Sequence, residues 1–220
     1  IACVTVIKYK KCNIESINNK MTKKKIICTV INDLVFDQRM QRICTSLQQN
    51  NFEVELVGRV LSNSKPLQNM VFQQTRLKCY VNKGFLFYAA INIRLFIYLL
   101  FHKFDIVCGC DLDTLPAAVF AAKLKCKKVV YDVHENVTES LKDKSWLPLK
   151  GLFISLYLWF DALAARNFSL VLAEQWYEKV YKYRYPKNAF TLVRNCAPAA
   201  LLKSFVNTQR QVTNNQVRIF

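Results

Sequence analysis

Short runs of consecutive apolar residues alternate along the chain with longer segments whose apolar residues recur at helical spacing. Continuous apolar runs of this length are typical of strands buried on both faces of a sheet. The predicted strands are 26–31, 53–57, 76–81, 105–110, 128–131, 169–173 and 189–193. The predicted helices are 39–50, 85–101, 114–125, 151–166 and 174–183. This alternation predicts an α/β domain, with a Rossmann-like parallel sheet and helices on both of its faces.

Two segments are apolar enough to be compared with membrane spans. The first, 85–101, has seventeen residues and is interrupted by Asn92 and Arg94, and the second, 152–160, is shorter. A span needs about twenty apolar residues, and a charge near its centre costs roughly 2.5–3.5 kcal/mol. We therefore expect neither segment to cross a membrane. A buried crossover helix is the favoured interpretation of 85–101, and a helix lying partly in a bilayer surface is the alternative.

The pattern weakens at both ends of the chain. Residues 1–22 have no periodicity, and Met21 stands just before three lysines and the first regular strand. We interpret 1–22 as an uncertain leader or read-through, and 23–205 as the Rossmann-like domain. Residues 206–220 join a polar stretch to Val217–Phe220 (VRIF), which predicts a linker and the first strand of a missing second domain.

The charge balance is strongly basic. The chain has 32 Lys+Arg against 15 Asp+Glu, a net charge of +17, and 52% of its residues are hydrophobic. Apart from a merely basic surface, such a balance favours an anionic partner: nucleic acid, an anionic membrane surface or a phosphorylated substrate. Nucleic-acid binding predicts a basic stripe with exposed aromatics, whereas the aromatics here lie mostly in apolar runs. We therefore expect no nucleic-acid partner and keep an anionic membrane surface open.

The spacing of cysteine and glycine excludes several kinds of site. The nine cysteines include no CxxC pair and lie mostly in apolar runs, which predicts reduced core residues of a cytosolic protein. Cys108 and Cys110 have no second ligand pair nearby in the sequence, so we expect no zinc site. The four glycines are far apart, whereas a loop that cradles phosphates needs clustered glycines. P-loop enzymes and GxGxxG dehydrogenases are therefore excluded.

Polar residues follow several of the predicted strands. In an open parallel sheet the carboxyl ends of the strands meet at one edge, where ligands bind. The residues that follow these strands are Asp37, Gln38 and Arg39, then Asp111, Asp113 and Thr114, then Asp132, His134 and Glu135, and finally Arg194 and Asn195. The first two sets are equally typical of helix caps, and that alternative stays open. His134 is the strongest candidate, because it directly follows a buried strand and is flanked by acids that can orient it.

Three blocks of the chain resemble one family of enzymes. They are NDLVFDQRMQRICTSLQQNNFEVELVGR, DLDTLPAAVFAAKLKCKKVVYDVHE, and AEQWYEKVYKYRY followed by VRNCAP. Together they are similar to the amino-terminal domain of family 4 glycosyltransferases, which are retaining GT-B enzymes with two Rossmann-like domains. The resemblance extends from about Lys23 to Pro198 and keeps the order and spacing of the blocks. Many members have a Gly-Gly pair after the first strand, where this chain has NDLVFDQR.

The resemblance implies the acceptor-binding half of a glycosyltransferase that transfers a sugar from a nucleotide-sugar to a saccharide or lipid-linked acceptor of the cell envelope. His134 matches the family's strand-end histidine and would be the catalytic residue, in contact with the donor sugar. The other candidates would bind substrate: Asp37, Gln38, Arg39, Asp111, Asp113, Thr114, Glu135, Arg194 and Asn195. Arg39 is also the candidate for holding an anionic acceptor group. The nucleotide-sugar is a co-substrate, and neither a cofactor nor a metal is expected.

The other half of such an enzyme binds the nucleotide-sugar, so the resemblance implies that this chain is inactive alone. The expected location is the cytoplasm, with peripheral attachment to the inner face of the cell membrane left open. The alternative function is a non-catalytic Rossmann-like module that binds a membrane or a partner protein.

Overall fold

A computed structural model of the chain describes residues 23–81, 84–134 and 150–194. Its strands are β1 (Lys25–Thr29), β2 (Glu53–Val60), β3 (Gln73–Lys78), β4 (Ile106–Cys110), β5 (Lys128–Val133), β6 (Ser169–Leu172) and β7 (Phe190–Leu192). Its helices are α2 (Gln38–Gln49), α3 (Gly84–Phe101), α4 (Asp111–Leu124), α6 (Lys150–Asn167) and α7 (Gln175–Arg184). The proposed leader and the proposed second-domain strand lie outside the described residues.

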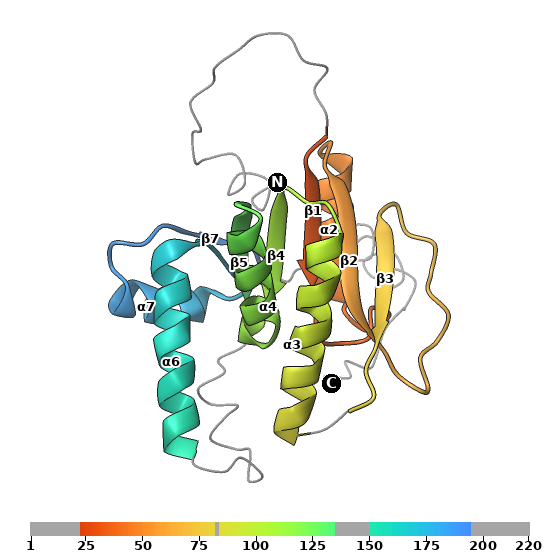
Figure 1. The fold of residues 1–220 in the computed structure, drawn as a ribbon. Coiled ribbons are helices and arrows are strands. Elements are labelled where there is room, and N and C mark those ends of the chain that lie inside the picture. Colours follow the sequence, from red (N-terminus) through yellow and green to blue (C-terminus); the bar gives the residue numbers. More distant parts are fainter. Residues whose placement is uncertain (1–22, 82–83, 135–149, 195–220) are drawn as a thin grey trace, which may run out of the picture.

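The strands form one parallel sheet in the order β3-β2-β1-β4-β5-β6-β7. The chain builds outward from β1 to β3 and then returns to place β4 on the other side of β1 (Figure 1). The strand order therefore reverses between β1 and β4. At such a switch point the connections leave the carboxyl ends of the two strands in opposite directions, which opens a crevice for ligands.

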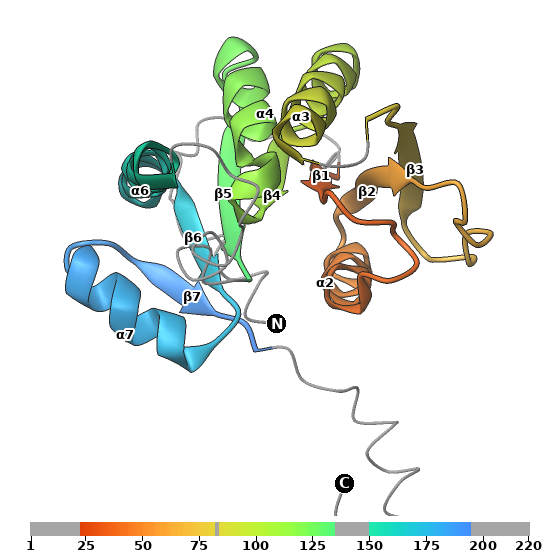
Figure 2. The same cartoon turned by 90° about the horizontal axis from the view of Figure 1, so that it is seen from below.

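Two hydrophobic cores lie on the two faces of the sheet. On one face α2 buries Met40, Ile43 and Leu47 against the strands, and on the other α3, α4, α6 and α7 share a larger core. Figure 2 shows α3 and α4 side by side on one side of the sheet and α2 on the other. The predicted α/β class, with a Rossmann-like parallel sheet covered on both faces, is confirmed.

Most predicted elements are observed within one or two residues of their predicted ends, with three larger differences. β2 continues three residues further than predicted, to Val60, β3 lies three residues earlier than predicted, and α4 begins at Asp111 rather than at Thr114. Pro116, expected in the first turn, is therefore inside the helix. None of the helices in the described ranges is long and apolar enough to cross a membrane, which agrees with the prediction for 85–101.

The described cysteines fit the sequence interpretation with one exception. Cys28, Cys44, Cys79, Cys108 and Cys110 are buried and not in disulfides, as predicted for reduced core residues. Cys126 is exposed, in the turn between α4 and β5, where its backbone is left-handed with φ 52°.

A buried aspartate, Asp161, connects α6, β5 and α7 on the β7 side of the sheet. Asp161 on α6 accepts hydrogen bonds from the hydroxyls of Tyr131 on β5 (3.0 Å), Tyr181 on α7 (2.6 Å) and Tyr185 after α7 (3.2 Å). Three donors compensate the cost of burying a carboxylate, which is only 3% exposed. The contact holds α6 and α7 against β5.

Asn92 explains how α4 tolerates a proline inside it. Pro116 has no N–H, and its ring disturbs the helical hydrogen bonds around it. The Asn92 side chain, on the neighbouring α3, donates to the Asp113 carbonyl (2.7 Å) and accepts from the Ala117 N–H (3.1 Å). These two groups are the ordinary i→i−4 pair of a helix, so the amide of Asn92 bridges a bond that has opened.

Asn92→Ala is expected to lower the free energy of unfolding by about 2 kcal/mol, because it leaves two buried backbone groups without partners. In a Pro116→Ala background the helix can close its own bond, and the cost of Asn92→Ala should fall below about 1 kcal/mol. Urea unfolding of the four variants of this cycle measures both costs. Equal costs in the two backgrounds would show that Asn92 does not repair the helix.

Candidate functional site

Arg39 is the most connected polar side chain at the carboxyl edge of the sheet. It lies in the first turn of α2, and its guanidinium is buried, with 8% of the side chain exposed. It donates to Asp132 Oδ1 (3.0 Å) and to the Val193 carbonyl (2.7 Å), and its Nε lies 2.9 Å from His134 Nε2. The planar guanidinium fork therefore joins the end of β5 to the chain that follows β7.

Asp132 carries the negative charge of this cluster. It is the penultimate residue of β5, and its side chain is 2% exposed. Burial alone would raise the pKa of this carboxyl, but hydrogen bonding and charge from His134 and Arg39 hold it below its usual value. Asp132 is therefore ionised at neutral pH.

His134 Nε2 lies 2.8 Å from Asp132 Oδ2 and 2.9 Å from Arg39 Nε. One ring nitrogen cannot donate to the carboxylate and accept from the guanidinium at once. Burial opposes a charge on His134, but the hydrogen bond and charge of the Asp132 carboxylate raise its pKa above the ordinary value. We therefore assign the proton to Nε2, which donates to Asp132, and His134 is an imidazolium at neutral pH. Asp132 then lies between two cations and offsets their repulsion.

Asp111 supports the other side of His134. It joins β4 to α4 with a left-handed backbone, φ 52°, which is uncommon for a residue other than glycine. Its Oδ1 accepts the backbone N–H of His134 (2.7 Å), and its Oδ2 lies 3.9 Å from His134 Nδ1. Burial raises the pKa of Asp111 to about 7, although the charge of His134 acts in the opposite direction. The site thus has one carboxyl that is ionised and one that titrates near neutrality.

Cys110, Asp132 and His134 offer one ligand atom each within 4.8 Å of one another, close enough for a metal ion. Cysteine binds a metal as thiolate, and burial beside Cys108 raises the pKa of Cys110 well above its usual range. Asp132 and His134 are also bonded to each other, with the Arg39 charge beside them. A cation would have to displace the guanidinium and two protons, so the cluster is better suited to hydrogen bonding than to metal binding.

The structure brings together only some of the residues predicted to form the site. Arg39, Asp111 and His134 meet in one cluster. Asp37 caps α2 by accepting from the Met40 N–H (3.0 Å), which is the capping role that the sequence left open. Thr114 is fully buried and its hydroxyl bonds to Thr29 (3.0 Å), so it lies beneath the cluster rather than beside it.

The remaining predicted residues lie at or outside the edge of the described structure. Gln38 is exposed in the first turn of α2, and Asp113 is half-buried in the first turn of α4. Arg194 is exposed and bonds to Gln175 at the start of α7 (2.8 Å), away from the cluster. Glu135 and Asn195 lie outside the described residues.

Three groups of the cluster were given no role from the sequence. Asp132 was recognised among the polar residues after β5 but was not assigned to the site. Cys110 was taken as core, although it contacts His134. The Val193 carbonyl carries no signal in the sequence, because a backbone group can be assigned only once the end of β7 is placed.

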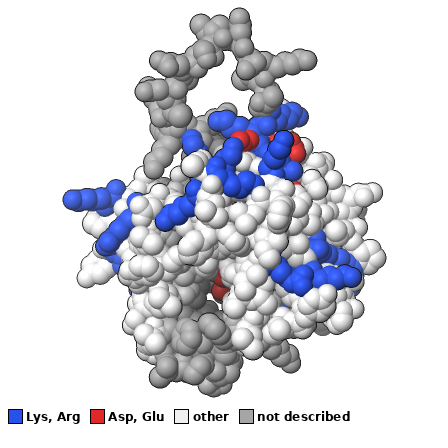
Figure 3. Space-filling model, viewed as in Figure 1, with Lys and Arg blue, Asp and Glu red and all other residues white. Residues whose placement is uncertain are grey.

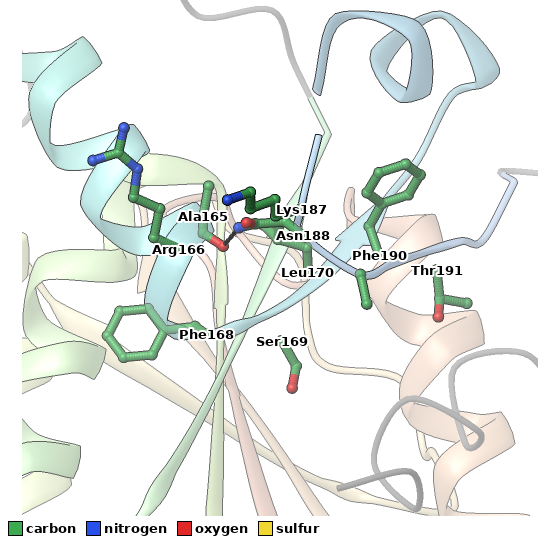
Figure 4. A pocket seen from close by; sticks show the side chains of 10 residues that line it. Ala165, Arg166, Phe168, Ser169, Leu170, Lys187, Asn188, Phe190 and Thr191 are labelled. Carbon is green, nitrogen blue, oxygen red and sulfur yellow. Dashed lines mark hydrogen bonds between the residues drawn. The ribbon is translucent and has the colours of Figure 1, made fainter. Parts of the chain in front are cut away.

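A cavity of about 400 Å³ lies at the opposite edge of the sheet, at the amino ends of β6 and β7 (Figure 4). The residues that line it are Ala165, Arg166, Phe168, Ser169, Leu170, Lys187, Asn188, Ala189, Phe190 and Thr191. Asn188 donates to the Ala165 carbonyl there. The cavity contains none of the cluster residues and lies away from the switch point, so we place the candidate site at Arg39, Asp111, Asp132 and His134 instead.

Arg39→Met is expected to lower the free energy of unfolding by about 3–5 kcal/mol, because it leaves the buried Asp132 without one of its two cationic partners. Arg39→Lys should recover part of this loss, since lysine keeps the charge but lacks the fork. Urea unfolding measures both. The exposed Arg166→Met is the control, with an expected change within about 0.5 kcal/mol. A cost below about 1 kcal/mol for Arg39→Met would contradict the role given to Arg39.

Asp111→Asn is expected to stabilise the fold at neutral and alkaline pH. The folded pKa of Asp111 is about 7, above the ordinary 3.8, so the unfolded chain loses this proton first as the pH rises. The stabilising contribution of the protonated folded form is complete below about pH 4 and lost by about pH 7. Asparagine tolerates the left-handed backbone and avoids the loss. The free energy of unfolding of Asp111→Asn should therefore equal that of the parent protein at pH 4 and exceed it by about 2–4 kcal/mol above pH 7.

Urea unfolding between pH 4 and pH 8.5 follows this difference. Asp105→Asn is the control, because its carboxyl has the opposite shift: burial raises its pKa, but the hydrogen bond and charge of Lys127 lower it below the usual value. The stabilising contribution of the Asp105 carboxylate is therefore complete above about pH 5, so the cost of Asp105→Asn should be nearly constant between about pH 5 and pH 8.5. The same pH trend for both variants would contradict the burial of Asp111.

No protein-family model matches the chain, and no curated protein matches it in sequence. Solved structures do match. Sucrose-phosphate synthase from Thermosynechococcus elongatus has a TM-score of 0.59 at 10% identity, over 84% of this chain and 53% of that chain. UGT89C1 from Arabidopsis thaliana has a TM-score of 0.50 at 12% identity, over 84% of this chain and 55% of that chain.

Both of these neighbours are GT-B glycosyltransferases, and the chain spans about half the length of each. At 10% and 12% identity the likeness establishes the fold and nothing about substrates. The chain therefore has a Rossmann-like α/β fold of the kind found in GT-B glycosyltransferases.

Proposed function

We propose that the chain is the amino-terminal, acceptor-binding half of a retaining, nucleotide-sugar-dependent glycosyltransferase that resembles family 4. The observation that carries this proposal is the placement of His134 at the carboxyl edge of a GT-B-like sheet, with its ring bonded to Asp132 and its backbone N–H bonded to Asp111. The likeness to about half of each GT-B neighbour supports it, because the other half would supply the nucleotide-sugar site.

His134 is the proposed contact to the donor sugar near the reacting centre. Its Nε2 is committed to Asp132, so Nδ1 is the ring atom that would donate to a sugar oxygen. A fixed cationic donor stabilises negative charge that develops on an oxygen as a glycosidic bond breaks. The His134 side chain is only 17% exposed, so Nδ1 would act in a site with little water. A hydrogen bond from a charged group is stronger there than in bulk water.

Arg39 is proposed as a positioning residue rather than as the contact to an anionic acceptor group. Its side chain already bonds to Asp132 and Val193 and approaches His134. An acceptor anion would have to compete with a buried carboxylate for the same guanidinium. Asp111 remains a proposed substrate-binding residue, and its pKa of about 7 suits a group that donates or accepts a proton near neutrality.

The proposed substrates are a nucleotide-sugar and a cell-envelope or lipid-linked saccharide, and the proposed place of action is the cytoplasmic face of a membrane. Retention at the anomeric carbon follows the family resemblance. The proposed reaction moves a glycosyl group from the nucleotide diphosphate to an acceptor hydroxyl. No metal is assigned to it, because the ligand cluster at Cys110 is already neutralised by Arg39.

His134→Ala and His134→Gln, made in the polypeptide of the complete reading frame that contains this chain, should lower kcat for sugar transfer about 100-fold or more. Glutamine keeps a donor to Asp132, which protects the fold, but cannot carry the positive charge. Transfer is measured by release of the nucleotide in the presence of acceptor.

His102→Ala is the matched control, because His102 is the other histidine of the sequence and lies stacked on Tyr98 after α3. Its loss should leave kcat within about twofold, as for an ordinary surface change. Transfer by the His134 variants at the rate of the parent protein would refute the assigned role.

A further inference from the structure

α3 is apolar on two opposite sides. One row of its side chains faces the core, and its members are Phe87, Ile91, Leu95 and Leu99. On the outer side Ile93 is 59% exposed, Ile97 is 48% exposed and Phe101 is 83% exposed. Helices that cover a sheet normally present a polar outer side to water. The outer side of α3 is therefore unusual for a protein surface in contact with water alone.

α4 continues this surface. Phe120 and Leu124 on its outer side are 58% and 68% exposed. The ends of the two helices lie together, because Lys125 after α4 donates to the carbonyls of Leu99 (2.9 Å) and His102 (2.6 Å) at the end of α3. We call the outer residues of both helices the apolar face: Ile93, Ile97, Phe101, Phe120 and Leu124.

The third helix on this side of the sheet, α6, has a similar outer row. Its exposed members recur at helical spacing and are Leu152, Leu156, Trp159 and Leu163. Figures 1 and 2 both place α6 on the same side of the sheet as α3 and α4. A large exposed apolar area of this kind marks an interaction surface.

Charge defines what this surface can contact. In the described residues of α3, α4 and α6 the acids are Asp111 and Asp113, in the first turn of α4, and the buried Asp161. At the other end of these helices, Lys103, Lys123 and Lys128 are exposed. Figure 3 shows Lys and Arg gathered at the top of the molecule with a few acids among them, and others at its two sides, around a front face that is mostly uncharged.

We propose that the apolar face and its lysines dock the protein on an anionic phospholipid bilayer. Phe and Leu side chains would enter the boundary between headgroups and acyl chains, and the lysines would remain at the level of the anionic headgroups. Exposed lysines at one end of an apolar face suit an anionic bilayer, whose headgroups attract them while its acyl boundary takes up the apolar side chains. The net charge of +17 acts in the same direction.

This docking would bring the candidate site to the membrane. α3 and α4 run antiparallel to the strands, so their amino-terminal ends lie at the edge that holds Asp111 and His134. A molecule lying on the apolar face keeps that edge beside the bilayer surface. The inference thus extends the lipid-linked part of the proposed function, and it is consistent with helices that do not span a membrane.

The test is sedimentation of the 220-residue chain with vesicles of phosphatidylcholine alone, or with one third phosphatidylserine. Binding is expected only to the anionic vesicles, and it should weaken as salt is raised. Phe101→Ser and Leu124→Ser should each lower the partition coefficient about tenfold, because each removes a large apolar group from the contact. Lys103→Gln and Lys123→Gln should each lower it about fivefold.

Phe36→Ser is the matched control, since Phe36 is 65% exposed but lies in the connection from β1 to α2, which packs on the face of the sheet opposite α3 and α4. It should bind within about twofold of the parent chain. Circular dichroism of each variant checks that the fold is kept. Equal binding to both kinds of vesicle, or binding by Phe101→Ser and Leu124→Ser at the parent level, would overturn the proposal.

Absence of vesicle binding overturns it as well. If sedimentation velocity then shows self-association that Phe101→Ser abolishes, the apolar face belongs to a contact between two copies of the chain. Sugar transfer is not measured in this test. Failure of docking therefore leaves the role of His134 standing, and failure of the His134 test leaves docking standing.

Discussion

The buried carboxylate of Asp132 is the interaction on which the arrangement of the site depends. Its charge needs partners, and the fold supplies Arg39 from α2 and His134 from the end of β5. Arg39 then also binds the Val193 carbonyl beyond β7. One ionised group therefore fixes the start of α2, the end of β5 and the exit of the sheet relative to one another, and it determines the protonation of the histidine that faces the crevice.

The elements and their order could be predicted from the sequence because burial on both faces leaves a clear signal. β1 and β4 are continuous apolar runs, and α2 shows one apolar stripe, so strand, helix and layer follow from spacing alone. The start of α4 could not be predicted in this way. Thr114 and Pro116 favour a helix that begins near them, whereas the observed helix starts at Asp111 and depends on Asn92 from another helix to bridge the bond that Pro116 opens.

The location of the site could be predicted from the sequence, but the hydrogen-bond partners of its residues could not. The rule that ligands bind at the carboxyl ends of parallel strands brought Arg39, Asp111 and His134 to one edge, and the structure joins them. The same rule could not show that Asp37 and Thr114 lie outside the site. Asp37 caps α2 and Thr114 bonds to Thr29 inside the core, and helix caps use the same residue types as ligand-binding sites. Nor could it show that Arg39 is committed to Asp132, since that contact joins residues far apart in the sequence.

The distribution of charge separates two tasks that the sequence presented together. At the carboxyl edge Arg39 and His134 share the one carboxylate of Asp132 in a compact set. The site therefore accounts for little of the excess of cations. Exposed lysines gather instead at the carboxyl-terminal ends of α3 and α4, where they also complement the helix dipoles. An anionic surface attracted by the net charge of +17 would meet that end and the apolar face, which leaves the polar crevice accessible to a saccharide.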